Sequence, residues 1–116
     1  MKYAVTITAV GSLARNFLEN NNSVIILDEG IRPNLADMVV QHTEGQLTKD
    51  IKAGDTLTVG DLAFKVVRVG EIANQTIRTE GHCTLVFNTE GTMPGQIIVQ
   101  GPVLPRLKAG DMITFV

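Results

Sequence analysis

Short segments rich in β-branched and other apolar residues recur along the whole chain, and turn residues separate them. Residues 2–10 alternate between apolar and polar side chains, which is the pattern of a strand with one buried face. Residues 24–27 are continuously apolar, which predicts a strand buried on both faces. The same reasoning predicts further strands over residues 38–40, 56–59, 63–69, 83–87, 96–99 and 112–116, with a hairpin turn at Gly60 and Asp61.

Two short helices are predicted between these strands. The first covers residues 13–19, with Ser12 as its N-cap. The second covers residues 71–79 and has Gly81 just beyond its end, where glycine commonly adopts a left-handed conformation. Pro33 favours one further helical turn. We therefore expect an all-β (mainly β) fold, a small β-barrel or sandwich with one or two short helices.

An internal similarity supports this expectation. Residues 52–59 and residues 108–115 both contain Lys-Ala-Gly-Asp followed by an alternating segment. One interpretation is that the barrel or sandwich has approximate internal symmetry. The other is that the same common turn sequence is used twice.

Composition limits the class of protein. A chain of 116 residues is the size of one domain, here residues 1–116. Residues 24–27 form the longest apolar stretch, far below the roughly 18 residues that span a bilayer, and the N-terminus lacks an export signal. A net charge of −2 argues against nucleic-acid binding, which needs a dense basic surface. The single cysteine, Cys83, fits a reducing compartment, so we expect a cytoplasmic protein without direct membrane insertion.

Few residues offer chemistry. The chain has no phosphate-binding loop and no nucleophile elbow. His42, His82 and Cys83 are too few for a metal site, because His82 and Cys83 are neighbours that would face opposite sides of a strand. We expect Cys83 to be a small buried apolar residue. On spacing alone, either histidine could be an ordinary structural or surface residue.

The acidic residues favour turns over catalysis. Asp28 and Glu29 follow a predicted buried strand, and Glu29, Glu44 and Glu90 each precede a glycine. Paired carboxylates can act as acid and base in glycoside hydrolysis. Glu-Gly pairs at strand ends are explained more simply as turns with solvated charge.

The order and spacing of several motifs resemble the glucitol/sorbitol-specific IIA components of the bacterial sugar phosphotransferase system. The similarity covers the chain from about residue 28 to the C-terminus, with a weaker match in the first strand. The matching motifs are Glu29-Gly30-x-x-Pro33-x-Leu35, His42-x-x-Gly45, Val69-Gly70, Gly81-His82-x-Thr84-Leu85-x-Phe87, Pro94-Gly95, Gly101-Pro102-Val103 and Gly110.

This resemblance implies a phosphotransferase subunit without cofactor or metal. A histidine of the family takes a phosphoryl group from the phosphocarrier HPr and passes it to a cysteine of the IIB component. The membrane component IIC then delivers phosphorylated glucitol. The phosphorylated histidine corresponds to His42, and His82 is expected to support it. Some members have a second histidine where this chain has Glu44.

The chemistry suits a neutral imidazole, which has a lone pair that can attack phosphorus. We expect the Thr43 hydroxyl and backbone N–H groups around Gly45 to bind the phosphoryl oxygens, together with His82. The second ring nitrogen of His42 should donate to an acceptor. We also expect His42 to be exposed within a shallow apolar patch. The candidate rim residues are Met38, Val39, Ile31 and Leu35, although the alternative interpretation, favoured for each taken singly, is a core residue.

A second hypothesis is a non-catalytic β-barrel binding or regulatory module of the same family, in which the histidines have no chemical role. Loss of phosphoryl transfer in a degenerate relative would leave the fold intact. Transfer of one phosphoryl group to the protein distinguishes the two hypotheses.

Overall fold

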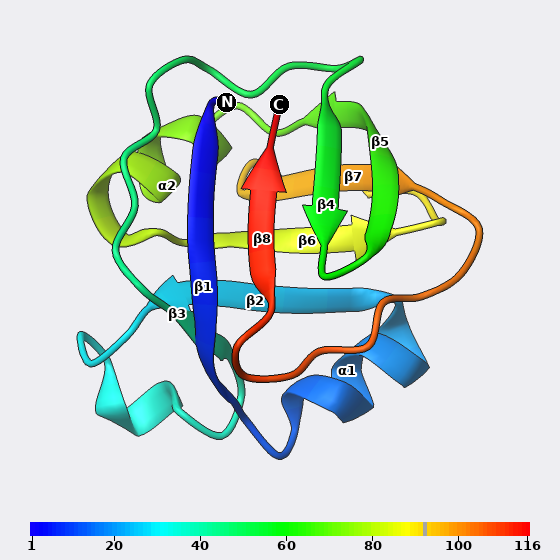
Figure 1. Ribbon diagram of the computed structural model, residues 1–116. Coiled ribbons are helices and arrows are strands. Elements are labelled where there is room, and N and C mark those ends of the chain that lie inside the picture. The colour runs from blue at the N-terminus through cyan, green and yellow to red at the C-terminus, as the bar shows by residue number, and fades with distance from the viewer. Residues whose placement is uncertain (92) are drawn as a thin grey trace.

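The computed structural model describes residues 1–91 and 93–116, and within them eight strands form a closed barrel (Figure 1). Around the barrel the order is β1-β3-β2-β6-β7-β5-β4-β8. The predicted mainly β barrel is confirmed. The strands are β1 (Tyr3–Val10), β2 (Ser23–Asp28), β3 (Val40–His42), β4 (Thr56–Val59), β5 (Leu62–Val69), β6 (Cys83–Phe87), β7 (Gln96–Gln100) and β8 (Met112–Phe115).

The first helix, α1 (Ala14–Asn21), lies close to its predicted position but begins differently. Leu13 is the residue at its N-cap, and no side chain caps it, so the predicted Ser12 cap is wrong. Leu13 is exposed, and the helix instead buries Ala14 and Leu18.

The second helix, α2 (Ala73–Glu80), ends as predicted. Gly81 follows it with φ of 61°, and its N–H donates to the Ile77 carbonyl. The helix begins two residues later than predicted. A single 3₁₀ turn, η1 (Pro33–Leu35), starts at the predicted proline. No helix in the described residues is long and apolar enough to cross a membrane.

The barrel interior holds the apolar core. Strand residues that face inward are almost fully buried, and the Phe64 and Phe87 rings pack edge to face with centroids 5.0 Å apart. In β2, Val24, Ile26 and Leu27 are buried, whereas Ile25 is partly exposed. The prediction of burial on both faces therefore holds for most of β2.

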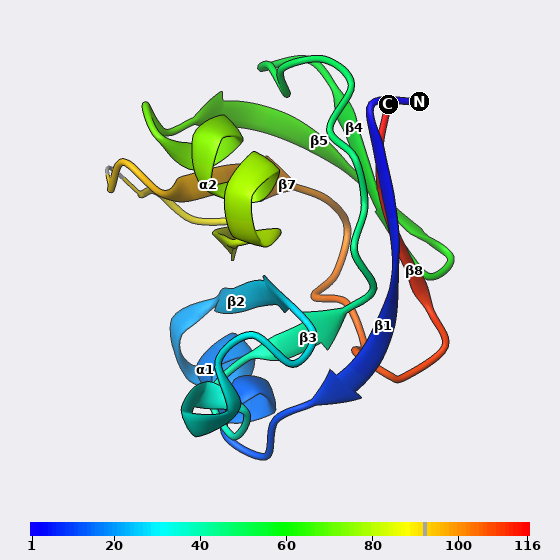
Figure 2. The ribbon, with the colours of Figure 1, turned by 90° about the vertical axis from the view of Figure 1, so that its left-hand side faces the viewer.

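Two halves of the chain repeat one arrangement. In each half a strand, a helix and three further strands follow one another, as β1-α1-β2-β3-β4 and β5-α2-β6-β7-β8. In both halves the second and third strands are parallel, while the first and third are antiparallel with a register shift. The halves join through four ladders, in which β2 pairs with β6, β4 pairs with β8, β1 pairs with β8 and β4 pairs with β5. Figures 1 and 2 show α1 beside strands of the first half and α2 beside strands of the second half.

This arrangement explains the similar segments at 52–59 and 108–115. Thr58 pairs directly with its repeat partner Thr114 across the β4–β8 ladder. Gly54 and Gly110 have φ of 98° and 96°, so both turns need the same left-handed glycine. Of the two interpretations, the structure supports internal symmetry.

Candidate active site

His42 is the last residue of β3, and its side chain points into the barrel. The alternation along β3 buries Val40 and His42 and leaves Gln41 partly exposed. The exposed fraction of His42 is 0%, so the expectation of an exposed ring is wrong. The physical reason is register: β1 and β2 pair with β3 on its two sides, and this fixes which residues face inward.

Both ring nitrogens of His42 contact backbone carbonyls. Nδ1 lies 2.7 Å from the Thr43 oxygen, and Nε2 lies 2.8 Å from the Gly81 oxygen. Carbonyl oxygens only accept hydrogen bonds, so both contacts are hydrogen bonds at once only when both nitrogens carry a proton. A neutral ring carries a proton on one nitrogen only, so it donates one of these two hydrogen bonds at a time.

Asp28 provides the nearest negative charge to this ring. Its Oδ1 lies 3.7 Å from His42 Nδ1, and its side chain is 15% exposed. Burial raises the pKa of the Asp28 carboxyl, and the nearby His42 opposes that rise. Glu44 and Glu80 reinforce the rise through charge repulsion. Asp28 Oδ1 has no hydrogen-bond partner within the described part of the chain.

Tyr3 completes the surroundings of the ring from β1. Its ring meets the His42 ring edge to face, with centroids 6.3 Å apart. Its hydroxyl is buried and has no hydrogen-bond partner among the described residues. Burial raises the pKa of the Tyr3 hydroxyl well above its usual range, with a further contribution from Asp28. This end of the barrel is therefore polar inside.

The expected phosphoryl ligands Thr43 and Gly45 are held against β1. Thr43 N–H donates to the Thr6 carbonyl, and Thr43 Oγ1 accepts from Thr6 N–H at 3.0 Å. A Cβ on Gly45 would lie 2.6 Å from Val5 Cγ1, so the chain needs glycine here to pass close to β1. Glu44, between them, is exposed.

His82 lies next to Gly81, but its side chain belongs to a pocket of about 240 Å³. Arg32 and Glu80 also line this pocket, and they form an ion pair at 2.6 Å. Of the residues expected around the site, Ile31 is exposed, Met38 is 38% exposed and Val39 is buried. The pocket is otherwise lined by Ile25, Leu27, Leu35, Met38 and Val39.

The remaining candidates behave as structural residues. Cys83 is fully buried in the barrel, and burial raises the pKa of its thiol. Glu29 and Glu90 are exposed, as solvated turns require. The described residues contain no group of three or more His, Cys, Asp or Glu that could hold a metal ion.

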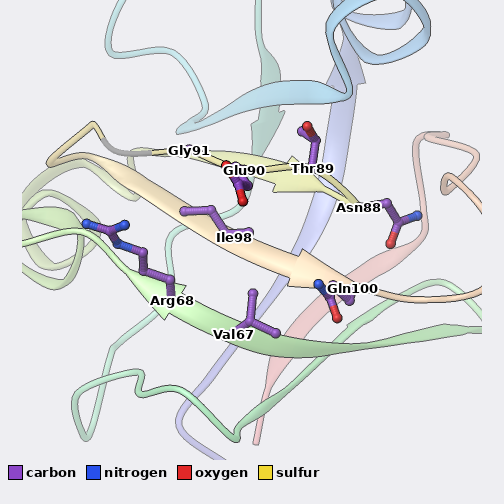
Figure 3. A pocket seen from close by; sticks show the side chains of 8 residues that line it. All are labelled: Val67, Arg68, Asn88, Thr89, Glu90, Gly91, Ile98 and Gln100. Carbon is purple, nitrogen blue, oxygen red and sulfur yellow. The ribbon is translucent and has the colours of Figure 1, made fainter.

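A second surface hollow, of about 460 Å³, lies away from His42 (Figure 3). Figure 3 shows that β5, β7 and the loop after β6 contribute its side chains. Arg68 and Glu90 are its charged residues. None of the predicted site residues lines it.

Comparison with known proteins identifies the chain. Residues 2–114 match the family model of the PTS system glucitol/sorbitol-specific IIA component. The chain belongs to this family. The glucitol/sorbitol-specific EIIA components of Shigella flexneri and Escherichia coli (strain K12) are each 30% identical to it over 115 residues, covering 97% of this chain and 93% of theirs. As a IIA component the protein is a phosphotransferase subunit, and a phosphoryl-relay role follows from the family.

The fold is also that of a solved IIA structure. The PTS system IIA component from Enterococcus faecalis V583 superimposes with a TM-score of 0.86, covering 97% of this chain and 98% of that chain. The two sequences are 20% identical, so this comparison supports the barrel architecture alone.

Sequence reasoning did not find the immediate surroundings of His42 in this IIA component. Asp28 was grouped with turn residues, whereas parallel pairing of β2 and β3 sets it directly beside His42. The Gly81 carbonyl carries no side-chain signal at all. Tyr3 was assigned only to the buried face of a strand. The available signal was that Asp28 and His42 each lie within two residues of the end of a predicted apolar strand.

Proposed function

We propose that His42 accepts a phosphoryl group from phospho-HPr and passes it to the cysteine of a glucitol/sorbitol IIB component. The phosphoryl group would then serve the uptake and phosphorylation of glucitol/sorbitol through the IIC membrane component. The protein would act in the cytoplasm as a single IIA domain spanning residues 1–116. The observation that carries the proposal is the His42 ring itself, held by one backbone carbonyl at Nδ1 and covered by another at Nε2.

Nε2 is the proposed phosphoryl-bearing atom. Nδ1 is bound to the carbonyl of the adjacent residue Thr43, which β1 holds in place through two hydrogen bonds. Nε2 faces Gly81, which lies in the turn after α2. A turn at a helix end moves at lower cost than a strand inside a barrel, because fewer contacts hold it. The neutral tautomer with Nδ1–H then presents its Nε2 lone pair.

Transfer therefore requires the segment Glu80–His82, here called the Gly81 turn, to move away from Nε2. The turn is held by the Gly81 N–H bond to the Ile77 carbonyl, the His82 N–H bond to the Thr76 carbonyl, the Thr76 hydroxyl bond to the His82 carbonyl and the Arg32–Glu80 ion pair. Each such hydrogen bond contributes about 1 kcal/mol, and an exposed ion pair contributes less. Docking of a partner protein can supply free energy on this scale.

Movement of the Gly81 turn also determines which groups reach the phosphoryl oxygens. His82 belongs to that turn, so we propose it as a supporting donor. The Thr43 hydroxyl and the Gly45 N–H are further proposed donors. We expect them to contribute less than His82, because Thr43 contacts Nδ1 and the phosphoryl group is proposed to bond to Nε2.

The test is phosphorylation by phosphoenolpyruvate, enzyme I and HPr. The wild-type protein should gain one acid-labile phosphoryl group, detected as a mass increase. A His42→Gln protein should gain none, because its amide can still donate to a carbonyl but cannot attack phosphorus.

A His82→Gln protein is the matched control. It should be labelled, but more slowly than wild type. Labelling of the His42→Gln protein would remove the assignment to His42. A wild-type protein that resists labelling while its HPr is phosphorylated would favour the non-catalytic module instead.

A further inference from the structure

Asp28 lies beside His42, and one oxygen of its carboxyl group lacks a hydrogen-bond partner among the described residues. The two residues are direct partners in the parallel β2–β3 ladder, and Asp28 Oδ1 is 3.7 Å from His42 Nδ1. Within the described chain this buried oxygen has no hydrogen-bond partner. A carboxylate oxygen in such a position is costly unless a positive charge lies near it.

The Gly81 turn packs closely against Asp28 and His42. A Cβ on Gly81 would lie 2.6 Å from His42 Cε1 and closer still to Asp28 Oδ1. The contact between these three residues therefore leaves no room for a methyl group. In this closed arrangement the Asp28 carboxyl lies beside a ring whose two nitrogens both contact backbone carbonyl oxygens.

We infer that Asp28 is a positioning residue for phosphoryl transfer, whose carboxylate offsets the positive charge that the His42 ring gains when Nε2 bonds to phosphorus. This inference rests on the proposed function of His42. Asp28 acts through His42 and need not touch the phosphoryl group.

The change in charge of the His42 ring during phosphoryl transfer explains why a carboxylate beside it is useful. The Nε2 lone pair forms a bond to phosphorus while the bond from phosphorus to the donor nitrogen breaks, and that electron pair stays on the donor. The Nδ1 proton remains on His42, hydrogen-bonded to Thr43. A neutral ring thus becomes a phosphoimidazolium inside a barrel, where the effective dielectric constant is low. A negative charge 3.7 Å away stabilises that product and the transition state leading to it.

A purely structural role does not explain Asp28. The charged and titratable groups that face it are His42 from β3, Glu44 from the segment after β3, Glu80 from the end of α2 and Tyr3 from β1. Burial disfavours the carboxylate most strongly, His42 favours it, and the like charges of Glu44 and Glu80 disfavour it further. The pKa of Asp28 is raised in consequence, so the ionised side chain opposes folding at neutral pH. A residue that opposes folding and adjoins the transferring ring suits a functional role.

The experiment compares Asp28→Asn with wild type in phosphoryl exchange with phospho-HPr. The amide keeps the shape of the side chain and removes the charge. An opposite charge within about 4–6 Å shifts a protonation equilibrium by tenfold or more, and formation of the phosphoimidazolium should respond similarly. We expect the equilibrium constant for phosphorylation of the Asp28→Asn protein to fall about tenfold, with an unchanged or raised melting temperature.

Glu44→Gln is the matched control, because it removes the same charge from an exposed nearby position. It should change the equilibrium constant less than about twofold, as expected for a screened surface charge. A wild-type equilibrium constant in Asp28→Asn would overturn the inference. A loss that matches a lowered melting temperature would overturn it too, because that is the signature of a structural role.

The pH dependence supplies a second measurement. The ratio of the wild-type to the Asp28→Asn equilibrium constant should fall toward one as the pH drops and Asp28 takes up a proton. A ratio that stays constant over that range would also contradict the inference. Labelling of the His42→Gln protein would overturn both proposals, whereas a labelled wild type, an unlabelled His42→Gln and a normal Asp28→Asn would overturn this inference alone.

Discussion

The two halves of the barrel share a backbone plan and differ in what that plan encloses. In the first half, β3 ends with a buried histidine, whereas the equivalent position of β7 is a buried valine. The ladders establish the equivalence, because Ile7 pairs with His42 just as Val66 pairs with Val99. The equivalent positions are His42 and Val99, Asp28 and Phe87, Gly81 and Asn22, and Tyr3 and Leu62.

This difference between the halves distinguishes the residues that the fold needs from those that the proposed chemistry needs. Around Val99 the interior is apolar, and Phe87 occupies the space that Asp28 has in the other half. The second half therefore packs without a polar group at this position of its third strand. The histidine and the carboxylate are present in one half only, and the glycine turn beside them leaves room for both.

The largest expected effect is at Gly81. In a Gly81→Ala protein, alanine would have to adopt φ near 61° and press its Cβ against His42 and Asp28. Left-handed strain of about 1 kcal/mol and overpacking of 1–3 kcal/mol should together lower the free energy of unfolding by about 3 kcal/mol, measured by urea denaturation.

Asn22→Ala is the control, since Asn22 is the equivalent residue and has φ of 56°. It should cost about 1–2 kcal/mol, because it adds left-handed strain and removes the hydrogen bond from Nδ2 to the Phe87 carbonyl. Equal losses in the two variants would mean that the packing of Gly81 against His42 and Asp28 is looser than the structure indicates.

Much of the fold could be predicted because strand patterns and turn glycines act locally. The alternation in residues 2–10 and the turn near Gly54 both predict the structures that form. The repeat at 52–59 and 108–115 indicated symmetry but did not reveal which strands are neighbours. Helix starts were less predictable: Ser12 has the right chemistry for a cap, yet tertiary packing of Ala14 and Leu18 decides where α1 begins.

The candidate site was predictable only as far as its histidine. His42 follows from the family motif, but its burial depends on the pairing of β3 with strands on both sides. The contact of Nε2 with Gly81 joins residues 39 positions apart through a backbone atom. Side-chain patterns carry no information on such a contact, so the sequence could not indicate that the ring is covered.

A medium effect is expected from the charge of Asp28 on stability. Since burial raises the pKa of Asp28 above 3.8, its contribution to stability is present at low pH and is lost as the pH rises through the folded-state value. Asp28→Asn should therefore match wild type at low pH and exceed it at neutral pH by about 1 kcal/mol, the scale of relieving an unsatisfied buried acceptor. Thermal melts across the pH range measure this difference.

Glu44→Gln is again the comparison, since Glu44 is exposed and should show little change with pH in the same melts. A wild-type protein more stable than Asp28→Asn at neutral pH would indicate that the attraction between Asp28 and His42 outweighs the burial of the carboxylate. The first half of the barrel would then gain stability from its polar residues.

The smallest expected effect concerns the ion pair between Arg32 and Glu80. It joins the loop after β2 to the Gly81 turn at 2.6 Å, and both side chains are substantially exposed. Glu80→Gln should change the free energy of unfolding by less than about 0.5 kcal/mol. Yet it should raise the initial rate of phosphorylation by phospho-HPr up to about twofold, because the turn covering Nε2 then opens more readily. Arg78→Gln is the control, since it breaks a similar pair with Asp50 near the same helix end without touching the loop after β2. A comparable acceleration by Arg78→Gln would attribute the effect to a loosened helix end, and an unchanged rate in Glu80→Gln would mean that this ion pair does not restrain the turn.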